Sequence, residues 1–294
     1  MSNLTCSPPI CAALPDRALL QVSGPDAVEF LNALVSNDVA LQAGPDGLKP
    51  AAYAALLTPQ GKFLHDFLIV TASADTLLLD VAAERRADLK RRLTLYRLRA
   101  KVEIAELDGW SGYALFGSGQ APAVPEGGVL FTDPRLPALG WRLWLPPGAA
   151  LEMTVTDVAA YEAHRLALGV PDGARDIEID KGLLLENHFE ALHGVDFKKG
   201  CYIGQELTAR TKYRGLLKKQ LYRIEAQDPD TALPAIGTPI TANGQEVGAL
   251  RTSIDGQGLA LLRLDAADQS LDAAGVALRA LRPDYAGPIP ESKA

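Results

Sequence analysis

Two apolar runs joined by a short turn constrain the fold of this chain more than any other feature. Residues 53–57 and 63–71 have the composition of strands, and Thr58-Pro59-Gln60-Gly61 between them has turn chemistry. Helix-like segments interrupt the strands: one opens at Gly24-Pro25, and another covers residues 82–95. Strand pairs interleaved with helices predict an α+β, ferredoxin-like layer rather than a doubly wound parallel sheet.

Apolar periodicity and Gly/Pro stop signals predict the other elements of this region. A Gly/Pro-rich stretch, residues 117–140, separates the last two strands. The expected elements are strands at residues 18–22, 76–81, 100–105, 113–116 and 141–145, and a helix at residues 157–168.

The pattern of predicted secondary structure changes after Leu217. Short alternating strands follow, with turns at Ala242-Asn243-Gly244, Asp255-Gly256 and Ala274-Gly275. This pattern predicts a small all-β barrel or sandwich. A chain of 294 residues is long enough for two or three compact units. We therefore expect an α+β region over residues 1–215 and a C-terminal β-barrel over residues 216–294.

Charge and composition narrow the functional classes. The net charge of −7 argues against broad electrostatic binding to nucleic acid or to anionic membrane. Basic residues cluster between Arg85 and Lys101 with acidic residues among them, so a solvated helix face and a patch for a polyanionic partner are both open. There is no run of about 18 apolar residues for a membrane span. Residues 1–15 show no secretory or transit pattern, so we expect a cytoplasmic protein.

The three cysteines, Cys6, Cys11 and Cys201, are too few and too scattered for a disulfide framework. Cys6 and Cys11 lie in a Pro-containing N-terminal segment that we expect to be frayed. Cys201 has different surroundings. Lys199 stands two residues before it, and nearby positive charge favours the thiolate over the thiol.

Two glycines and a predicted helix surround this cysteine. Gly200 and Gly204 remove side chains on both sides, so that backbone or a ligand can come close. A helix from about Gln205 would place free N–H groups near the cysteine and favour an anion there. Glu206 and Arg210 are four residues apart and can pair on one helix face. The alternative is that the cysteine is a buried small residue in a glycine turn.

The segment Lys199-Gly-Cys-Tyr-Ile-Gly-Gln-Glu206, with Ala209-Arg210 beyond it, resembles the K-G-C-[FY]-x-G-Q-E-x-x-[AV]-R signature of the YgfZ-type folate-binding proteins. Leu185-Glu186-Asn187 and residues 194–197 resemble the lead-in to that signature. Residues 22–31 and Ser36-Asn37-Asp38 are similar to an N-terminal segment shared with the aminomethyltransferase (T-protein) of the glycine cleavage system. The resemblance covers most of the chain and is most specific over residues 185–215.

The resemblance implies a monomer with three domains arranged as a ring: two intertwined ferredoxin-like α+β units and a C-terminal β-barrel. Tetrahydrofolate is expected near the central hole. No stably bound metal is expected, because thiolate clusters usually take four cysteines. Cys201 and Lys199 are the candidate reactive residues. The candidate folate contacts are Asp66, Glu186, Gly200, Tyr202, Gln205, Glu206 and Arg210.

Asp66 aligns with a folate-contacting carboxylate of the aminomethyltransferase. A carboxylate there can accept hydrogen bonds from the pterin or meet a developing positive charge at a folate nitrogen. The transferase usually carries two adjacent acids, whereas His65 precedes Asp66 here. His65 is then a proton carrier or a structural histidine. Asp66 is alternatively a surface residue at a strand edge, and Glu186 is a second candidate acid.

Resemblance and chemistry together predict a tetrahydrofolate-binding protein that supports assembly, repair or maintenance of 4Fe–4S clusters. Its partners would be client enzymes or cluster-assembly proteins, with no nucleic acid and no membrane. Cys201 would line the central cavity as a thiolate, with Glu206 and Arg210 holding the loop. An accessory factor is favoured over an enzyme. Two alternatives stay open: a folate-dependent, aminomethyltransferase-like one-carbon transferase, and a non-catalytic scaffold regulated by folate.

Overall fold

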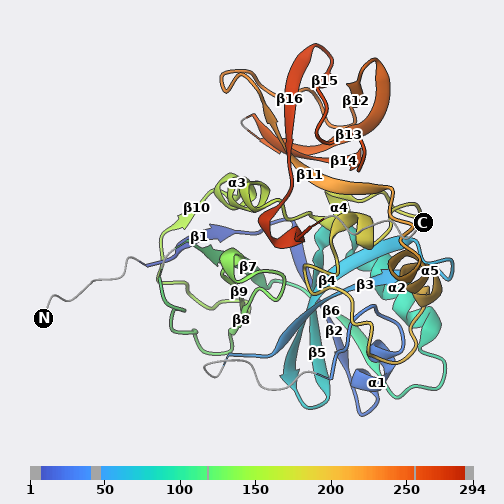
Figure 1. Ribbon diagram of the computed structural model, residues 1–294. Coiled ribbons are helices and arrows are strands. Elements are labelled where there is room, and N and C mark those ends of the chain that lie inside the picture. Colours follow the sequence, from blue (N-terminus) through green and yellow to red (C-terminus); the bar gives the residue numbers. More distant parts are fainter. Residues whose placement is uncertain (1–7, 41–47, 118, 255, 289–294) are drawn as a thin grey trace, which may run out of the picture. The chain divides into compact units, whose positions relative to one another are not determined.

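The computed structural model describes residues 8–40, 48–117, 119–254 and 256–288 (Figure 1). The chain divides into two compact units. The first unit contains Met1–Ala55, His65–Tyr161 and His193–Tyr202. The second unit contains Leu56–Leu64, Glu162–Leu192 and Ile203–Ala294. Each unit is therefore assembled from segments that are far apart in the sequence.

The first sheet, which belongs mainly to the first unit, has the strand order β3-β4-β5-β2-β6. The pairs β4–β5, β5–β2 and β2–β6 are antiparallel. Residues 63–70 of β4 are all buried, and all of them except His65 and Asp66 are apolar, as is usual for an inner strand covered on both faces. The strands are β2 (Arg17–Ser23), β3 (Ala51–Leu57), β4 (Phe63–Ser73), β5 (Thr76–Ala82) and β6 (Glu103–Leu107).

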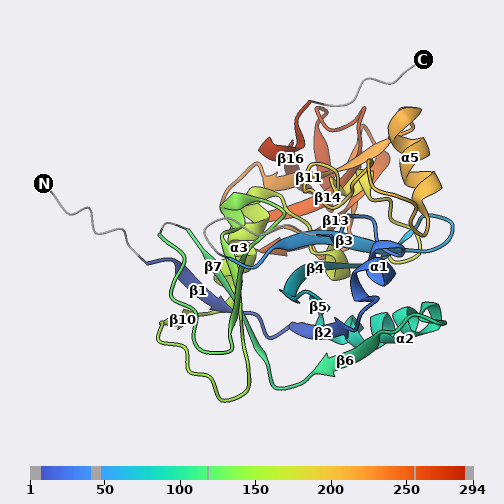
Figure 2. The ribbon, with the colours of Figure 1, turned by 90° about the horizontal axis from the view of Figure 1, so that it is seen from below.

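Two helices pack on this sheet: α1 (Ala27–Asn32) contacts β5, and α2 (Arg86–Tyr96) contacts β2 and β6 (Figure 2). The helix α2 buries Leu89 and Leu93. Its basic residues belong to the predicted basic stretch. Four of them form ion pairs with neighbouring carboxylates: Arg86 and Lys90 with Glu106, and Arg91 and Arg92 with Asp88.

The second sheet of the first unit has the order β10-β1-β7-β9-β8, and Cys11 lies in its core with Leu115, Leu130 and Leu143. The expected fraying of the N-terminal segment is wrong for Cys11, because its strand pairs with β7 and β10. Burial raises the pKa of the Cys11 thiol to about 11. Cys6 lies outside the described residues. The strands are β1 (Ile10–Ala13), β7 (Ser111–Phe116), β8 (Val129–Thr132), β9 (Trp141–Leu145) and β10 (Val155–Thr156).

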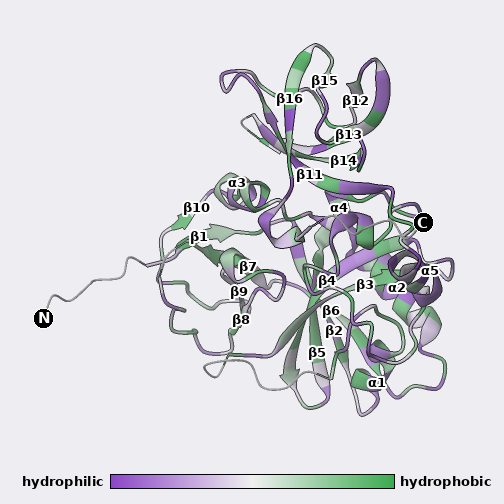
Figure 3. Cartoon of the chain, in the orientation of Figure 1, coloured by the Kyte–Doolittle hydropathy of each residue, from purple (hydrophilic) through white to green (hydrophobic). Residues whose placement is uncertain are grey.

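The C-terminal part of the second unit is a closed barrel with the order β11-β14-β13-β12-β15-β16. Closure leaves no free sheet edge, and its core includes Ile224, Ile240, Leu250 and Leu262. The strand β16 is mainly hydrophobic (Figure 3), and Arg279 is its one charged residue. The strands are β11 (Lys219–Ala226), β12 (Pro239–Ala242), β13 (Gln245–Ile254), β14 (Gln257–Arg263), β15 (Leu271–Ala273) and β16 (Val276–Leu281).

Short helices complete the two units. No helix of the described ranges is both long and apolar enough to cross a lipid bilayer. The helices are α3 (Val158–Leu168), α4 (Gly173–Asp176) and α5 (Gln205–Tyr213), together with the 3-10 turns η2 (Ala83–Arg85), η3 (Pro137–Leu139), η4 (Leu185–Asn187) and η5 (Asp284–Ala286).

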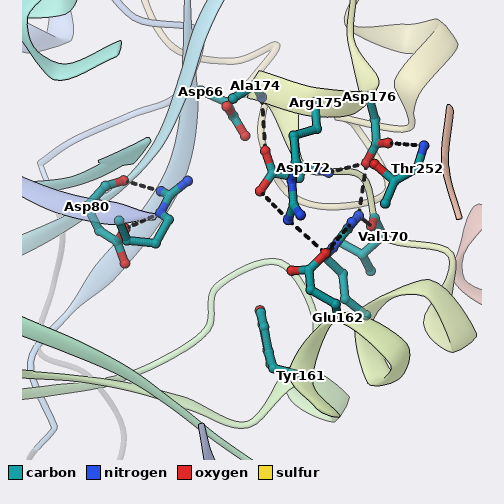
Figure 4. A network of polar contacts seen from close by, with 12 residues as sticks. Asp66, Asp80, Tyr161, Glu162, Val170, Asp172, Ala174, Arg175, Asp176 and Thr252 are labelled. Carbon is teal, nitrogen blue, oxygen red and sulfur yellow. Dashed lines mark hydrogen bonds and ion pairs between the residues drawn. The ribbon is translucent and has the colours of Figure 1, made fainter. Parts of the chain in front are cut away.

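A buried arginine, Arg165, ties several elements of the second unit together, and Figure 4 labels its partners Glu162, Val170 and Asp176. Arg165 on α3 donates to Glu162 at 2.8 Å and to Asp176 on α4 at 2.9 Å. Asp176 in turn accepts a hydrogen bond from the Thr252 backbone N–H on β13 at 3.0 Å. Burial alone would lower the pKa of Arg165, but the charges of Asp176 and Glu162 raise it above its usual range. The network therefore joins α3 and α4 to the barrel.

The structure confirms the α+β class and the C-terminal β-barrel expected from the sequence. Three strands of the α+β region were not predicted: β1, β8 in the Gly/Pro-rich stretch, and β10. Each has four residues or fewer, too few to show a clear period. The ring arrangement and the boundary after residue 215 stay predictions.

Candidate functional site

Cys201 lies on an exposed loop directly before the helix predicted from the sequence. Its side chain is exposed and its thiol is free, so the alternative of a buried cysteine in a glycine turn is wrong. The helix α5 begins at Gln205, as expected. The chain passes from the first unit to the second between Tyr202 and Ile203. The signature segment thus contributes Lys199 and Cys201 to one unit, and α5 to the other.

Lys199 anchors this loop to the end of α1. Its Nζ donates to the backbone oxygens of Asn32 at 2.7 Å, Val35 at 2.6 Å and Asn37 at 2.9 Å. Burial lowers the pKa of Lys199 to about 8, so at neutral pH it is an ammonium whose three donors meet three acceptors. The ammonium also lies 5.3 Å from the centroid of the Tyr202 ring. The contacts of Lys199 are those of an anchor, and its predicted action on Cys201 stays a prediction.

A second set of contacts fixes the chain just before the signature. The Ser36 hydroxyl donates to the Gly194 backbone oxygen at 2.6 Å. The Asn37 side-chain amide donates to the His193 oxygen at 2.7 Å and to the Tyr53 oxygen at 2.8 Å. The Ser36-Asn37 pair noted near the start of the sequence thus holds the segment that leads to Cys201. No local sequence signal predicts that these two segments are in contact, because they are about 160 residues apart.

The two glycines of the signature have different surroundings. Gly204 has φ +76°, and a Cβ there would lie 2.4 Å from the Thr58 oxygen and 2.8 Å from the Gly61 Cα. This close approach packs the start of α5 on the predicted turn between β3 and β4. Around Gly200 a Cβ would meet nothing within 4 Å. Gly204 therefore serves backbone packing, whereas the space beside Gly200 is open to a ligand or a partner.

Gly204→Ala should destabilise the second unit by about 2–4 kcal/mol. An alanine there would have to adopt a left-handed backbone conformation, and its Cβ would also clash with backbone atoms. Gly200→Ala should change the free energy of unfolding by less than about 1 kcal/mol. Denaturant unfolding followed by circular dichroism measures both. Equal losses for the two variants would contradict the different packing of Gly200 and Gly204.

Asp66 is a buried residue of β4 and not a surface residue at a strand edge. It is 9% exposed, and its Oδ2 accepts a hydrogen bond from the Tyr53 hydroxyl at 2.9 Å. The Arg135 guanidinium lies over the Tyr53 ring at 5.6 Å from its centroid, and Arg135 itself is paired with Asp133 at 2.7 Å. The Asp66 carboxylate is thus oriented by a buried tyrosine.

His65 is structural in character. Its side chain is buried, and its Nε2 lies 2.9 Å from Asp88 Oδ2. Burial, together with the charge of Arg85, lowers the pKa of His65 to about 4 despite the hydrogen bond to Asp88. The imidazole is therefore neutral at pH 7, which favours the structural role over that of a proton carrier.

The buried neutral histidine should make the protein less stable in mild acid. The pKa of His65 is about 4 in the folded state against 6.5 ordinarily, so between these values the unfolded chain binds a proton that the folded chain does not. Stability should therefore fall as the pH falls, by about 2 kcal/mol from pH 7 to pH 5 for this one group. Denaturant unfolding of the wild type and of His65→Gln at both pH values isolates the contribution of His65 to this pH dependence. Identical pH slopes would contradict the assignment.

Glu186 belongs to the second unit, where it lines a polar cavity of about 220 Å³ with Lys219 and Arg251. Burial raises the pKa of the Glu186 carboxyl, although Lys219 and Lys62 oppose the shift. Arg251 donates to Glu178 at 2.8 Å, while its Nε is buried and has no hydrogen-bond partner within the described part of the chain. A desolvated acid and an unused donor make this cavity suited to a polar ligand.

The other signature residues lie along or near α5. Gln205 is half-buried, while Glu206 and Arg210 are exposed. In the described ranges Glu206 and Arg210 form no ion pair with each other, so the expected pairing is not seen. The predicted site residues are thus distributed over both units: Asp66, Lys199, Gly200, Cys201 and Tyr202 in the first, and Glu186, Gln205, Glu206 and Arg210 in the second.

Comparison with known proteins first defines the class. A family model described as the C-terminal β-barrel domain of CAF17 matches residues 218–288. The crystal structure of glycine cleavage system aminomethyltransferase T from Bartonella henselae matches 98% of this chain and 89% of its own, with a TM-score of 0.73 and 16% sequence identity. Fold and site thus define a protein of the aminomethyltransferase fold with an exposed signature cysteine.

Closer relatives identify the family. The human mitochondrial iron–sulfur cluster assembly factor IBA57 is 36% identical, over 94% of this chain and 85% of the relative. The mouse protein of the same name is 35% identical, over 86% and 77%. The chain belongs to this family of iron–sulfur cluster assembly factors.

Proposed function

We propose that this protein supports the assembly, repair or maintenance of 4Fe–4S clusters in client enzymes, and that the thiol of Cys201 is its working group. The observation that carries the proposal is the exposed, free Cys201 on a loop anchored by Lys199. Exposure makes the sulfur accessible to a partner, and the anchor keeps the loop in one place. Membership of a family of cluster assembly factors supports the same function.

We further infer that tetrahydrofolate is the ligand. The residues present fit such a group: Asp66 is an oriented acceptor, and the cavity beside Glu186 offers a desolvated acid and cationic groups for a polar ring and its carboxylates. The tetrahydrofolate would supply one-carbon or redox chemistry. Asp66 or, alternatively, Glu186 would bind and orient it.

A folate-dependent one-carbon transferase is the second candidate. The fold match to an aminomethyltransferase and the buried, oriented Asp66 favour it. The exposed cysteine does not favour the transferase, since a transferase of this kind does not need a cysteine. The relatives are named as mitochondrial proteins, and for this chain the cytoplasmic location, like the monomeric state, stays a prediction.

Complementation of a strain that lacks the native gene tests the proposal. Cys201→Ser should abolish rescue of a 4Fe–4S enzyme and leave glycine cleavage flux unchanged. Cys11→Ser is the matched control, because that thiol is buried and protonated. Full rescue by Cys201→Ser would overturn the role of the thiol. If glycine cleavage fails instead and Asp66→Asn is the damaging change, the protein is a transferase.

A further inference from the structure

The second unit contains another cavity, on different residues from the one beside Glu186. Its volume is about 320 Å³, within the range of about 300–1,000 Å³ that is usual for ligand pockets. Much of its wall is apolar, from Leu185, Ala191, Leu217 and Ala286. The polar residues of the wall are His188, Glu190, Thr211, Lys212, Gln220 and Arg282.

Arg282 brings a positive charge to this cavity that no carboxylate of the described residues neutralises. Its Nε donates to the Gly287 oxygen at 2.6 Å, and its Nη2 donates to the Ala286 oxygen at 3.3 Å. It also donates to the Gln220 side-chain oxygen. These acceptors are neutral. Since a guanidinium in a protein stays protonated, Arg282 is a fixed, half-buried cation.

The other ionisable groups of the wall add no net charge. Lys212 forms an ion pair with Glu190. His188 is 3% exposed, and its Nε2 lies 2.8 Å from the Leu221 oxygen, which can only accept, so Nε2 carries the proton. Burial lowers the pKa of His188 to about 4, so the ring is neutral at pH 7. Arg282 is thus the only uncompensated charge among these lining residues.

The wall is also preformed. The His188 ring is held by the Leu221 oxygen and by an edge contact with Tyr285, with ring centroids 5.7 Å apart. Tyr285 donates in turn to the Gly169 oxygen at 2.7 Å. Arg282 is held by the oxygens described above. A ligand would therefore meet groups that are already in place, which lowers the entropic cost of binding.

We propose that this cavity binds a small monocarboxylate with an aromatic or branched apolar body. The apolar wall would take the body, and the carboxylate would neutralise Arg282. A carboxylate would supply the counter-charge that the half-buried Arg282 lacks among the described residues, whereas a neutral ligand would supply none and a dianion would exceed it. The proposal goes beyond the function proposed above: none of the lining residues is Cys201, Lys199, Asp66 or Glu186.

Titration calorimetry of the full chain with benzoate, and with benzamide as its uncharged analogue, tests the proposal. Benzoate should bind with one site and at least tenfold more tightly than benzamide. Arg282→Gln should weaken benzoate at least tenfold and leave benzamide unchanged. The matched control is Arg279→Gln, because Arg279 lies on the neighbouring strand β16, is exposed and is paired with Glu225; it should bind like the wild type.

Two further variants keep the proposal testable if Arg282→Gln fails to fold. Arg282→Lys keeps the charge and should retain benzoate binding within about tenfold, since a lysine still pairs with a carboxylate but lacks the fork. Ala191→Phe fills the cavity and should abolish binding of both compounds. Equal affinity for benzoate and benzamide, unchanged affinity in Arg282→Gln, or no saturable binding at millimolar benzoate would overturn the proposal. Loss of Cys201 function would not affect any of these results.

Discussion

Arg165→Met should remove about 3–5 kcal/mol from the free energy of unfolding of the second unit. The substitution leaves Glu162 and Asp176 buried without the guanidinium that lies between them. It also removes the 2.6 Å hydrogen bond to the Val170 oxygen, so that an acceptor is left unsatisfied. Denaturant unfolding followed by circular dichroism measures the loss.

Arg263→Met is the control for this experiment. Arg263 also forms an ion pair, with Asp265, but both side chains are exposed. Exposed pairs contribute about 1 kcal/mol or less, so this variant should stay close to the wild type. Similar losses in Arg165→Met and Arg263→Met would show that burial of the network does not determine its strength.

Lys199→Met should lower the local stability of residues 193–202 by about 2–5 kcal/mol, because three carbonyl oxygens lose a charged donor at once. Hydrogen exchange of the amides in this segment measures the change. We expect cluster-enzyme rescue to fall with it, although the thiol is still present. Lys198→Met is the matched control, since the adjacent side chain is exposed; it should exchange like the wild type.

The rate of Cys201 alkylation separates the two roles of Lys199. An anchor acts through the position of the loop. Lys199→Arg keeps the charge but loses the compact fit of three donors to three acceptors, so it should also increase hydrogen exchange of residues 193–202. A charge effect on the thiol would instead leave Lys199→Arg normal and slow alkylation in Lys199→Met. Protection of residues 193–202 that is unchanged in Lys199→Met would contradict the anchoring role.

Local patterns predicted much of the secondary structure. The hairpin at Thr58-Pro59-Gln60-Gly61 and the helix from Gln205 follow from signals within a few residues, and both are found. The turns after Leu217 likewise predicted the barrel. The strand β1 has four residues and takes its conformation from its partners β7 and β10, so no local signal reveals it.

The contacts of the site were harder to predict because they join distant segments. Lys199 follows its three acceptors by about 160 residues, and only the fold brings them together. The spacing of Glu162 and Arg165 is that of an ordinary exposed helix pair, yet both are buried. The role of Gly204 likewise depends on Gly61, a residue of another element.

The interleaving of the two units sets an order for folding during synthesis. The first unit lacks its last segment, His193–Tyr202, until most of the chain has left the ribosome. The hairpin tip Leu56–Leu64 belongs to the unit that is finished last, since β16 must emerge before the barrel closes. The apolar residues on either side of the turn, Leu56, Leu57, Phe63 and Leu64, are thus made early, whereas much of their unit is made late. The nascent chain should therefore depend on chaperones at this point more than a chain of the same length with consecutive domains.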